Sequence, residues 1–193
     1  MGLEAFIGIK VFDRDGKVII RRKKRSRSFV RGFNHVLCAQ MRSETTPAPA
    51  IQTRDTSNVN QSIRTADSPF WADAPAGNTL YGIVVGTDST PVDIEQYALV
   101  AKCTHGSGAN QLVYQACTCT WLGVAAGAAS FTVDRSMLNN SGAPVAVEEI
   151  GIYIESAKLG AVLIYIMGMR DLYSLAIPDG GGITVTYTIG IVA

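Results

Sequence analysis

The stretch of sequence that decides the fold is Ile183-Thr184-Val185-Thr186-Tyr187-Thr188-Ile189-Gly190-Ile191-Val192. Large apolar residues alternate in it with threonine and glycine, so one face of the segment is apolar and the other is mostly polar. Alternation with a period of two among β-branched and aromatic residues predicts a strand with one packed face. The stretch therefore indicates an antiparallel sheet that covers a core on one side.

Upstream of this strand, the chain from residue 80 onward has the same character. The predicted strands lie at 80–86, 98–104, 111–122, 129–138, 145–155, 161–167, 171–177 and 183–192. Turns rich in Gly, Asn, Asp and Pro separate most of them. Short strands at this spacing favour an antiparallel β-sandwich or jelly-roll-like domain over residues 80–193. A short helix is also expected at 93–97, with Asp93 as its cap.

The N-terminal part, residues 1–42, is predicted to form a β-hairpin followed by one helix. The alternation at 5–12, the Asp-Arg-Asp-Gly turn at 13–16 and the strand at 17–22 are typical of a hairpin. Ser28 is expected to cap the helix. The apolar residues of the helix lie on one amphipathic stripe, which consists of Phe29, Phe33, Val36, Leu37 and Met41. The fold class is thus mainly β, with one hairpin and one amphipathic helix added.

Residues 43–79 are expected to be an extended connection with at most a minor hairpin. The segment contains four prolines and many Ser, Thr and Asn residues. Phe70 and Trp71 stand out in it as large aromatic residues. They are expected either to pin the connection onto the core or to contact another subunit.

Charge is divided unevenly along the chain. The net charge is only +1. Residues 1–42, however, carry eleven Lys/Arg against three acids, a net of +8, and residues 43–193 carry six against thirteen, a net of −7. Two interpretations stay open. In the first, the positive segment of one copy attracts the negative segment of another, so that copies associate head to tail. In the second, the two segments neutralise each other within one molecule.

The basic run between residues 21 and 31 is the clearest candidate site. It contains seven cations in eleven residues: Arg21, Arg22, Lys23, Lys24, Arg25, Arg27 and Arg31. Such a run predicts contact with an acidic protein surface or with nucleic acid. Phe29 is the one aromatic residue nearby, so base stacking is not supported. The alternative is a solvated strand end whose charges block edge-to-edge aggregation.

No catalytic, cofactor-binding or metal-binding residues are predicted. The two histidines, His35 and His105, lie in a helix and in a Gly-rich turn, without the framing of a nucleophile motif. Glu148 and Glu149 are adjacent on a strand and so point to opposite faces. Asp88, Asp93 and Glu95 lack the spacing of a calcium loop. The four cysteines form no CxxC pair and are expected to be buried free thiols.

The sequence also bears on location. The longest apolar run, 159–169, is too short for a membrane span, and no secretory signal is visible at the N-terminus. We therefore expect no membrane contact and assembly in a cytoplasm. Low charge, 17% against about 25% in typical soluble domains, is typical of a surface partly covered by neighbours.

Several stretches carry a resemblance to known proteins. These are Val11-Phe12-Asp13, Ser28-Phe29-Val30-Arg31, Tyr81-Gly82-Ile83-Val84-Val85-Gly86-Thr87, Phe131-Thr132-Val133-Asp134-Arg135, Glu149-Ile150-Gly151-Ile152-Tyr153, Arg170-Asp171 and 183–189. Together they resemble structural proteins encoded among the genes of tailed bacteriophages. The resemblance implies a β-rich virion component present in several copies, and it carries no catalytic residues.

The resulting expectation is a non-enzymatic structural subunit of a tailed-phage virion, in the tail or head–tail region. Its partners would be further copies of itself and other virion proteins. One alternative is a capsid-decorating protein that grips the shell. Another is a receptor- or glycan-binding β-sandwich, which would need exposed aromatic residues at one end. The candidates for those are Tyr114, Trp121, Tyr153 and Tyr173.

Overall fold

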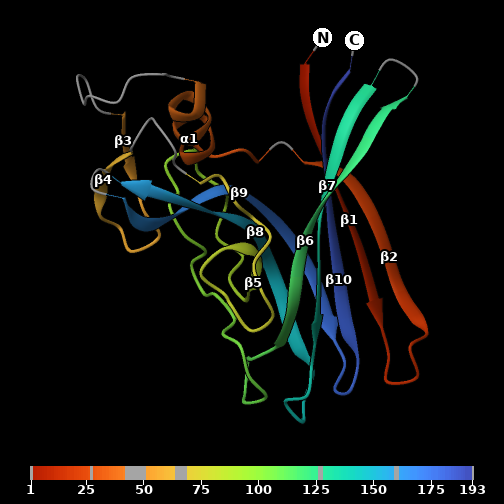
Figure 1. Ribbon diagram of the computed structural model, residues 1–193. Coiled ribbons are helices and arrows are strands. Elements are labelled where there is room, and N and C mark those ends of the chain that lie inside the picture. Colours follow the sequence, from red (N-terminus) through yellow and green to blue (C-terminus); the bar gives the residue numbers. More distant parts are fainter. Residues whose placement is uncertain are drawn as a thin grey trace.

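The protein is mainly β, with two antiparallel sheets that confirm the predicted sandwich-like class. A computed structural model describes residues 2–26, 28–41, 51–63, 69–125, 128–158 and 161–192. Sheet A has five strands, which follow one another in space as β2 (Val18–Ser26), β1 (Gly2–Phe12), β10 (Gly182–Val192), β7 (Ala128–Leu138) and β6 (Val113–Ala125). Figure 1 shows these long strands running side by side, with both chain ends at one end of the sheet.

Sheet B is built around the long strand β8. Its path runs through β3 (Ile51–Arg54), β4 (Asn60–Ile63), β8 (Val145–Lys158) and β5 (Gly82–Gly86), while β9 (Val162–Ile177) pairs with the other edge of β8. The helix α1 (Arg31–Met41) packs on β9 and β3. At eleven residues α1 is too short to cross a bilayer, and no helix elsewhere in the described ranges is long and apolar enough to do so.

Strand β10, which contains the alternating stretch 183–192, lies at the centre of sheet A. Ile183, Val185 and Tyr187 are fully buried, and the threonines between them are partly exposed. β1 pairs antiparallel with β10 over its whole length, from Gly2 opposite Val192 to Phe12 opposite Gly182. The predicted hairpin is confirmed, but it is an integral part of the main sheet. Sheet A therefore combines strands from the predicted arm at 1–42 with strands from the predicted sandwich at 80–193.

The segment 98–104 was expected to be a strand and is not one. It touches β5 through a single bridge between Gly86 and Lys102. Three of its N–H groups donate to side chains of β8: Leu99 N donates to the Tyr153 hydroxyl, and Val100 N and Ala101 N donate to Glu149. Because these side chains satisfy the backbone, no continuous ladder forms. The predicted strands at 161–167 and 171–177, by contrast, are one strand, β9.

Two helix predictions also need correction. The segment 93–97 forms a turn, in which Gln96 N donates to Asp93 O and Glu95 N donates to Asp93 Oδ1. Ser28 does not cap α1, which begins at Arg31; its hydroxyl donates to Asp171 instead. A tertiary partner has thus replaced the local one.

The amphipathic stripe of the helix is only partly as expected. Phe33 and Val36 are buried, and Phe29 packs on Phe33 with 4.6 Å between ring centroids. Leu37 is 38% exposed, whereas Ala39, which was not predicted to face the core, is fully buried. The side chain of Met41 and residue Arg42 lie outside the described part of the structure.

Candidate functional site

The basic run lies largely on β2, the edge strand of sheet A. Within the described residues β2 pairs only with β1. All five of its cations, from Arg21 to Arg25, have exposed side chains. Arg27 lies outside the described residues. Arg31 belongs to α1, where it donates to Glu95 and to His35 Nε2. The run is therefore divided between a strand and a helix.

Two of the β2 cations face the neighbouring sheet. Arg22 and Lys24 pair with Ile9 and Ile7, whose side chains are buried, so they leave the inner side of sheet A. Lys24 Nζ donates to Leu172 O at 2.8 Å and lies 4.1 Å from the centre of the Tyr173 ring. Arg22 Nη1 donates to Ser174 O at 3.4 Å. These side chains join β2 to β9 where no backbone ladder does.

The other three cations leave the outer side of the sheet. Arg21 pairs with Lys10, and Lys23 lies over the Phe6 ring at 5.5 Å. Arg25 forms an ion pair with Glu4 at 2.6 Å. Arg21 has no hydrogen bond or ion pair within the described ranges. The outer face thus presents charge to solvent, whereas the inner face uses it to hold the sheets together.

A groove with a volume of about 710 Å³ lies between β2 and β9. Its lining consists of Arg21, Arg22, Lys23, Lys24, Ser89, Glu148, Leu172, Tyr173 and Ser174. Tyr173 is 8% exposed, and its hydroxyl has no hydrogen-bond partner in the described structure. Burial, together with the nearby Asp171 carboxylate, raises the pKa of Tyr173 far above its usual range, so the hydroxyl stays protonated.

Next to the groove, on β9, lies the buried carboxylate of Asp171. It accepts hydrogen bonds from the hydroxyls of Ser26 at 2.7 Å, Ser28 at 3.1 Å and Tyr187 at 3.0 Å. Lys24 Nζ lies 3.8 Å away. Three hydrogen bonds and one nearby cation stabilise this buried charge, so Asp171 has a structural role.

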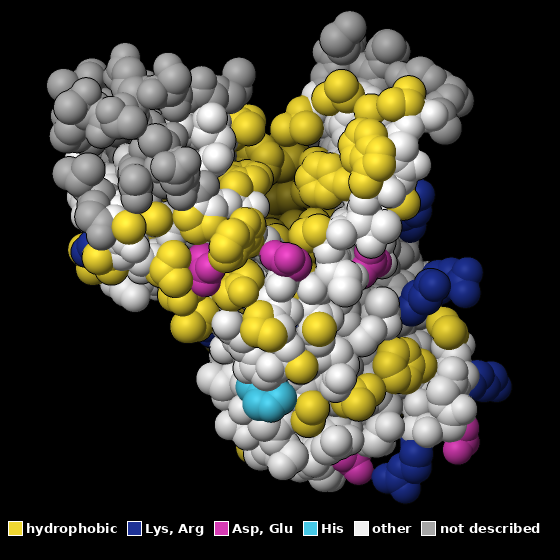
Figure 2. All heavy atoms as spheres, viewed as in Figure 1, with side chains coloured by type: hydrophobic (Ala, Val, Ile, Leu, Met, Phe, Trp, Pro, Cys, Tyr) yellow, Lys and Arg dark blue, Asp and Glu magenta, His cyan; other side chains and the backbone are white. Residues whose placement is uncertain are grey.

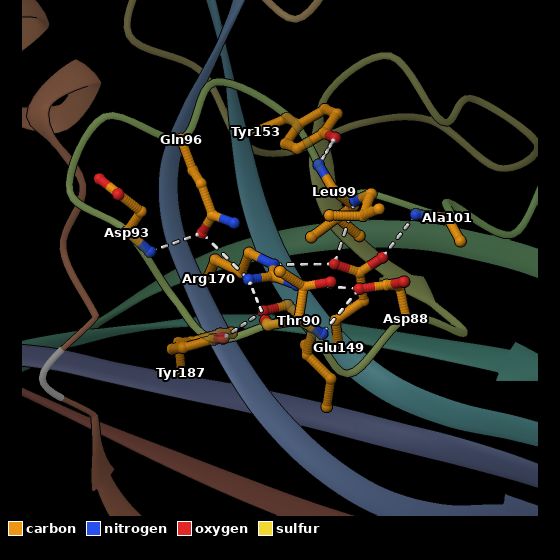
Figure 3. A network of polar contacts seen from close by, with 12 residues as sticks. Asp88, Thr90, Asp93, Gln96, Leu99, Ala101, Glu149, Tyr153, Arg170 and Tyr187 are labelled. Atoms are coloured by element: carbon orange, nitrogen blue, oxygen red, sulfur yellow. Dashed lines mark hydrogen bonds and ion pairs between the residues drawn. The ribbon is translucent and has the colours of Figure 1, made fainter.

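The preceding residue, Arg170, is the centre of a second network, on the outer face of sheet B (Figure 3). Its side chain is fully buried, and its Nε donates to Glu149 Oε2 at 2.8 Å. Its Nη1 donates to Thr90 O and Gln96 Oε1, and Asp88 lies 3.9 Å from its Nη2. These contacts fasten the loop at 87–101 to β8 and β9. Glu148 points away from Glu149, as predicted, and accepts from Ser174 at the surface.

The end of sheet A at which both chain ends lie is apolar at its surface. Trp121, Leu122 and Val124 of β6 are 65%, 54% and 75% exposed. Leu3 of β1 and Ile191 of β10, which lie in the same row across the sheet as Val124, are about half exposed. Figure 2 shows a hollow lined with hydrophobic side chains in the upper part of the molecule. An apolar cavity of about 200 Å³ lies between α1, β8 and β9 on one side and β6, β7 and β10 on the other, and Phe33, Phe70 and Phe131 are among its lining residues.

Phe70 and Trp71 have different positions. Phe70 packs against the core, with its ring edge-on to Phe33 at 6.0 Å. Trp71 forms a two-way backbone bridge with Glu155 and leaves its ring 56% exposed. The structure therefore brings Phe70 to the core, whereas Trp71 remains on the surface.

The groups capable of chemistry lie apart from one another. His105 Nδ1 accepts from Tyr114 N, and the pKa of His35 is lowered by burial and by Arg31. No three His, Cys, Asp or Glu residues within the described ranges are placed to hold a metal ion. All four cysteines are free, but Cys38 and Cys119 are exposed, which corrects the expectation of four buried thiols. Although the Cys119 residue is exposed, partial desolvation of its thiol and the nearby Cys117 and Asp73 raise the pKa of Cys119 to about 11, so this thiol is not activated.

The cations of the groove were predicted from the sequence, but their neighbour Tyr173 and the apolar end of sheet A were not. A usable signal was Trp121-Leu122, because two large apolar neighbours on one strand cannot both face the core. Comparison with known proteins finds no matching family model, no matching curated protein and no matching solved structure.

Proposed function

We propose that the protein is a non-enzymatic structural subunit of a tailed-phage virion, in the tail or head–tail region, that assembles in several copies. The apolar end of sheet A, formed by Leu3, Trp121, Leu122, Val124 and Ile191, is the contact between copies. The phage setting rests on the sequence resemblance. The assembling role rests on the surface.

The exposure of this apolar end carries the proposal. Three large apolar side chains of β6 are more than half exposed, and two more, on β1 and β10, lie at the same end of the sheet. Contiguous apolar surface on a soluble protein marks an interaction site or an aggregation hazard. At about 25 cal/mol per Å² of covered apolar surface, burying such side chains between subunits stabilises association.

The polar groups support a structural role as well. The most deeply buried charges, Arg170, Glu149 and Asp171, are paired with one another or with loop and strand groups of the same chain. Arg135 likewise donates hydrogen bonds to backbone carbonyls, among them Gln115 O, Ile83 O and Asn78 O. These residues hold loops onto the sheets, which produces a rigid body of the kind a repeated subunit needs.

The glycan-binding alternative is weaker, because its aromatic cluster does not form. Tyr114, Tyr153 and Tyr173 are 1%, 2% and 8% exposed, and Trp121 alone of the four candidates faces solvent. The capsid-decorating alternative shares the same chemistry. Labelling the protein in intact particles distinguishes a shell position from a tail position.

The test compares two double variants by size-exclusion chromatography with light scattering. The wild type is expected to form a discrete oligomer, and W121S/V124S is expected to be monomeric. The matched control I94S/V100S also removes two exposed apolar side chains, 64% and 56% exposed, away from the sheet end, and it should assemble normally. A wild-type protein that stays monomeric and is absent from purified particles by mass spectrometry would contradict the proposal.

A further inference from the structure

The groove between β2 and β9 has one closed end and one open end. Where it is closed, the segment that follows β2 is bonded to β9: Arg170 N donates to Ser28 O and Val30 N donates to Gly168 O, both at 3.1 Å. Farther along, no backbone hydrogen bond joins β2 to β9 in the described ranges. There Leu172 O and Ser174 O are reached only by the side chains of Lys24 and Arg22.

At the open end, the outer backbone edge of β2 has no strand partner among the described residues. β2 is the last strand of sheet A, and its ladder to β1 uses one edge only. Unpaired N–H and C=O groups on an edge strand are a template for a further strand. The cations of β2 protect this edge against unspecific pairing, but they do not protect it against a strand of opposite charge.

The side chains in the groove are suited to an anionic group. Lys24 and Arg22 are exposed cations, and Tyr173 adds a hydroxyl that is buried and without a partner. A buried polar group without a partner costs free energy, so such a group in a groove calls for an explanation. A carboxylate between the two cations would accept from both and from the tyrosine hydroxyl.

We propose that this groove binds an extended acidic segment of a partner protein, which adds to β2 as a further strand and places a carboxylate against Arg22, Lys24 and Tyr173. This inference goes beyond the assembly proposed above, because it concerns a different surface and a partner of different chemistry.

Two features favour an acidic strand over nucleic acid. Glu148 lines the same groove and accepts from Ser174, so a uniform polyanion would bring like charges together, whereas a strand can turn alternate side chains away. The groove also lacks an exposed ring for base stacking, since Tyr173 is buried and Lys24 covers its face.

The test measures binding of a fluorescein-labelled ten-residue peptide of alternating Glu and Val by fluorescence anisotropy. The wild type is expected to bind it and to ignore a Gln-Val peptide of equal length. Binding should weaken as salt rises. Amide hydrogen exchange of β2 should slow in the complex, because an added strand protects backbone N–H groups that a side-chain contact leaves exposed.

Variants distinguish binding in the groove from unspecific attraction to the positive charge of the hairpin. R22Q/K24Q is expected to weaken binding at least about tenfold, since both charged contacts are lost. Tyr173→Phe keeps the ring and should weaken binding about threefold through loss of one hydrogen bond. The control K10Q/K17Q removes the same charge from the same hairpin outside the groove, and it should bind within about twofold of the wild type. Thermal unfolding of each variant checks that the fold is intact.

Equal loss in both double variants, or no peptide binding at all, would overturn the inference. Tighter binding of a twenty-nucleotide oligo-dT than of the peptide would overturn it in favour of nucleic acid. The outcome does not depend on the proposed assembly, because W121S/V124S leaves the groove untouched. A monomeric protein that still binds the peptide would refute the assembly and keep the groove.

Discussion

Arg170 and Asp171 are adjacent in β9, so their side chains leave opposite faces of sheet B. Arg170 joins the loop at 87–101 to β8 through Glu149, Thr90 and Gln96. Asp171 joins β2 and β10 to β9 through Ser26 and Tyr187. Two neighbouring charges therefore connect sheet B to a loop on one side and to sheet A on the other.

Removing Arg170 is expected to be strongly destabilising. Arg170→Met keeps much of the side-chain volume but leaves the fully buried Glu149 carboxylate, among the described residues, with only the N–H groups of Val100 and Ala101 as partners. Breaking a buried ion pair by removing one partner costs about 3–5 kcal/mol. Urea unfolding should therefore show a midpoint well below that of the wild type.

An exposed ion pair provides the control for this measurement. Arg31 and Glu95 lie 2.8 Å apart, with side chains 55% and 58% exposed. Arg31→Met should cost less than about 1 kcal/mol, because solvent screens the pair. If the two variants lost similar stability, Arg170 would not have the structural role assigned to it.

At the scale of elements, α1 is held against β9 by a close backbone approach at Gly32. A Cβ at this position would lie 2.5 Å from Met167 O and 2.7 Å from Ile166 Cγ2. Contacts this short require the helix to move away from the strand. The glycine therefore sets the distance at which Phe33 and Val36 reach the core.

This approach predicts the sign of a substitution in α1. Helix propensity alone favours Gly32→Ala by about 1 kcal/mol. The clash with the backbone of β9 opposes it, and overpacking costs about 1–3 kcal/mol, so the variant should be less stable than the wild type. Asn34→Ala, on the exposed side of the same helix, should be neutral or slightly stabilising.

Thermal unfolding of both alanine variants checks this prediction. A Gly32→Ala protein with a raised melting temperature would mean that propensity outweighs the contact, and that α1 can shift on β9 at little cost.

At the scale of the whole molecule, charge and apolar surface lie at different places. The basic edge of β2 flanks the groove, while the apolar end formed by Leu3, Trp121, Leu122, Val124 and Ile191 lies outside it. Two modes of association are therefore separable by salt. Attraction between unlike charges is screened by salt, whereas burial of apolar surface is not weakened by it.

The proposed oligomer should accordingly persist at high ionic strength. Light scattering at low salt and at about 1 M NaCl, where the Debye length is about 3 Å, should yield the same oligomer mass. Dissociation in high salt would instead support the charge-driven, head-to-tail interpretation of the +8 and −7 segments.

How far the sequence predicts the structure depends on where each residue finds its partner. The alternation in β10 and the turn at 13–16 are local signals, and both the strand and the hairpin were predicted from them. The segment 98–104 has a similar local pattern but is not a strand, because Glu149 and Tyr153, about fifty residues away, take its N–H groups. Ser28 fails as a cap for the same reason, with Asp171 as the distant partner.

The candidate site shows the same division. The basic run is visible in the sequence as seven cations, and its exposure on a strand follows from its composition. Which cations face inward depends on the register of β2 against β1, with Arg22 and Lys24 opposite Ile9 and Ile7. The contacts of these side chains with β9 join residues about 150 positions apart.

By itself, the sequence determined the β class, the hairpin, the helix and the position of the basic charge, because periodicity and composition act within a few residues. The tertiary structure alone decided that β1 lies inside the main sheet, that Tyr173 stands beside Lys24, and that Trp121 and Val124 are left uncovered. These outcomes depend on which strands become neighbours, and strand pairing is settled by packing between distant segments rather than by local preference.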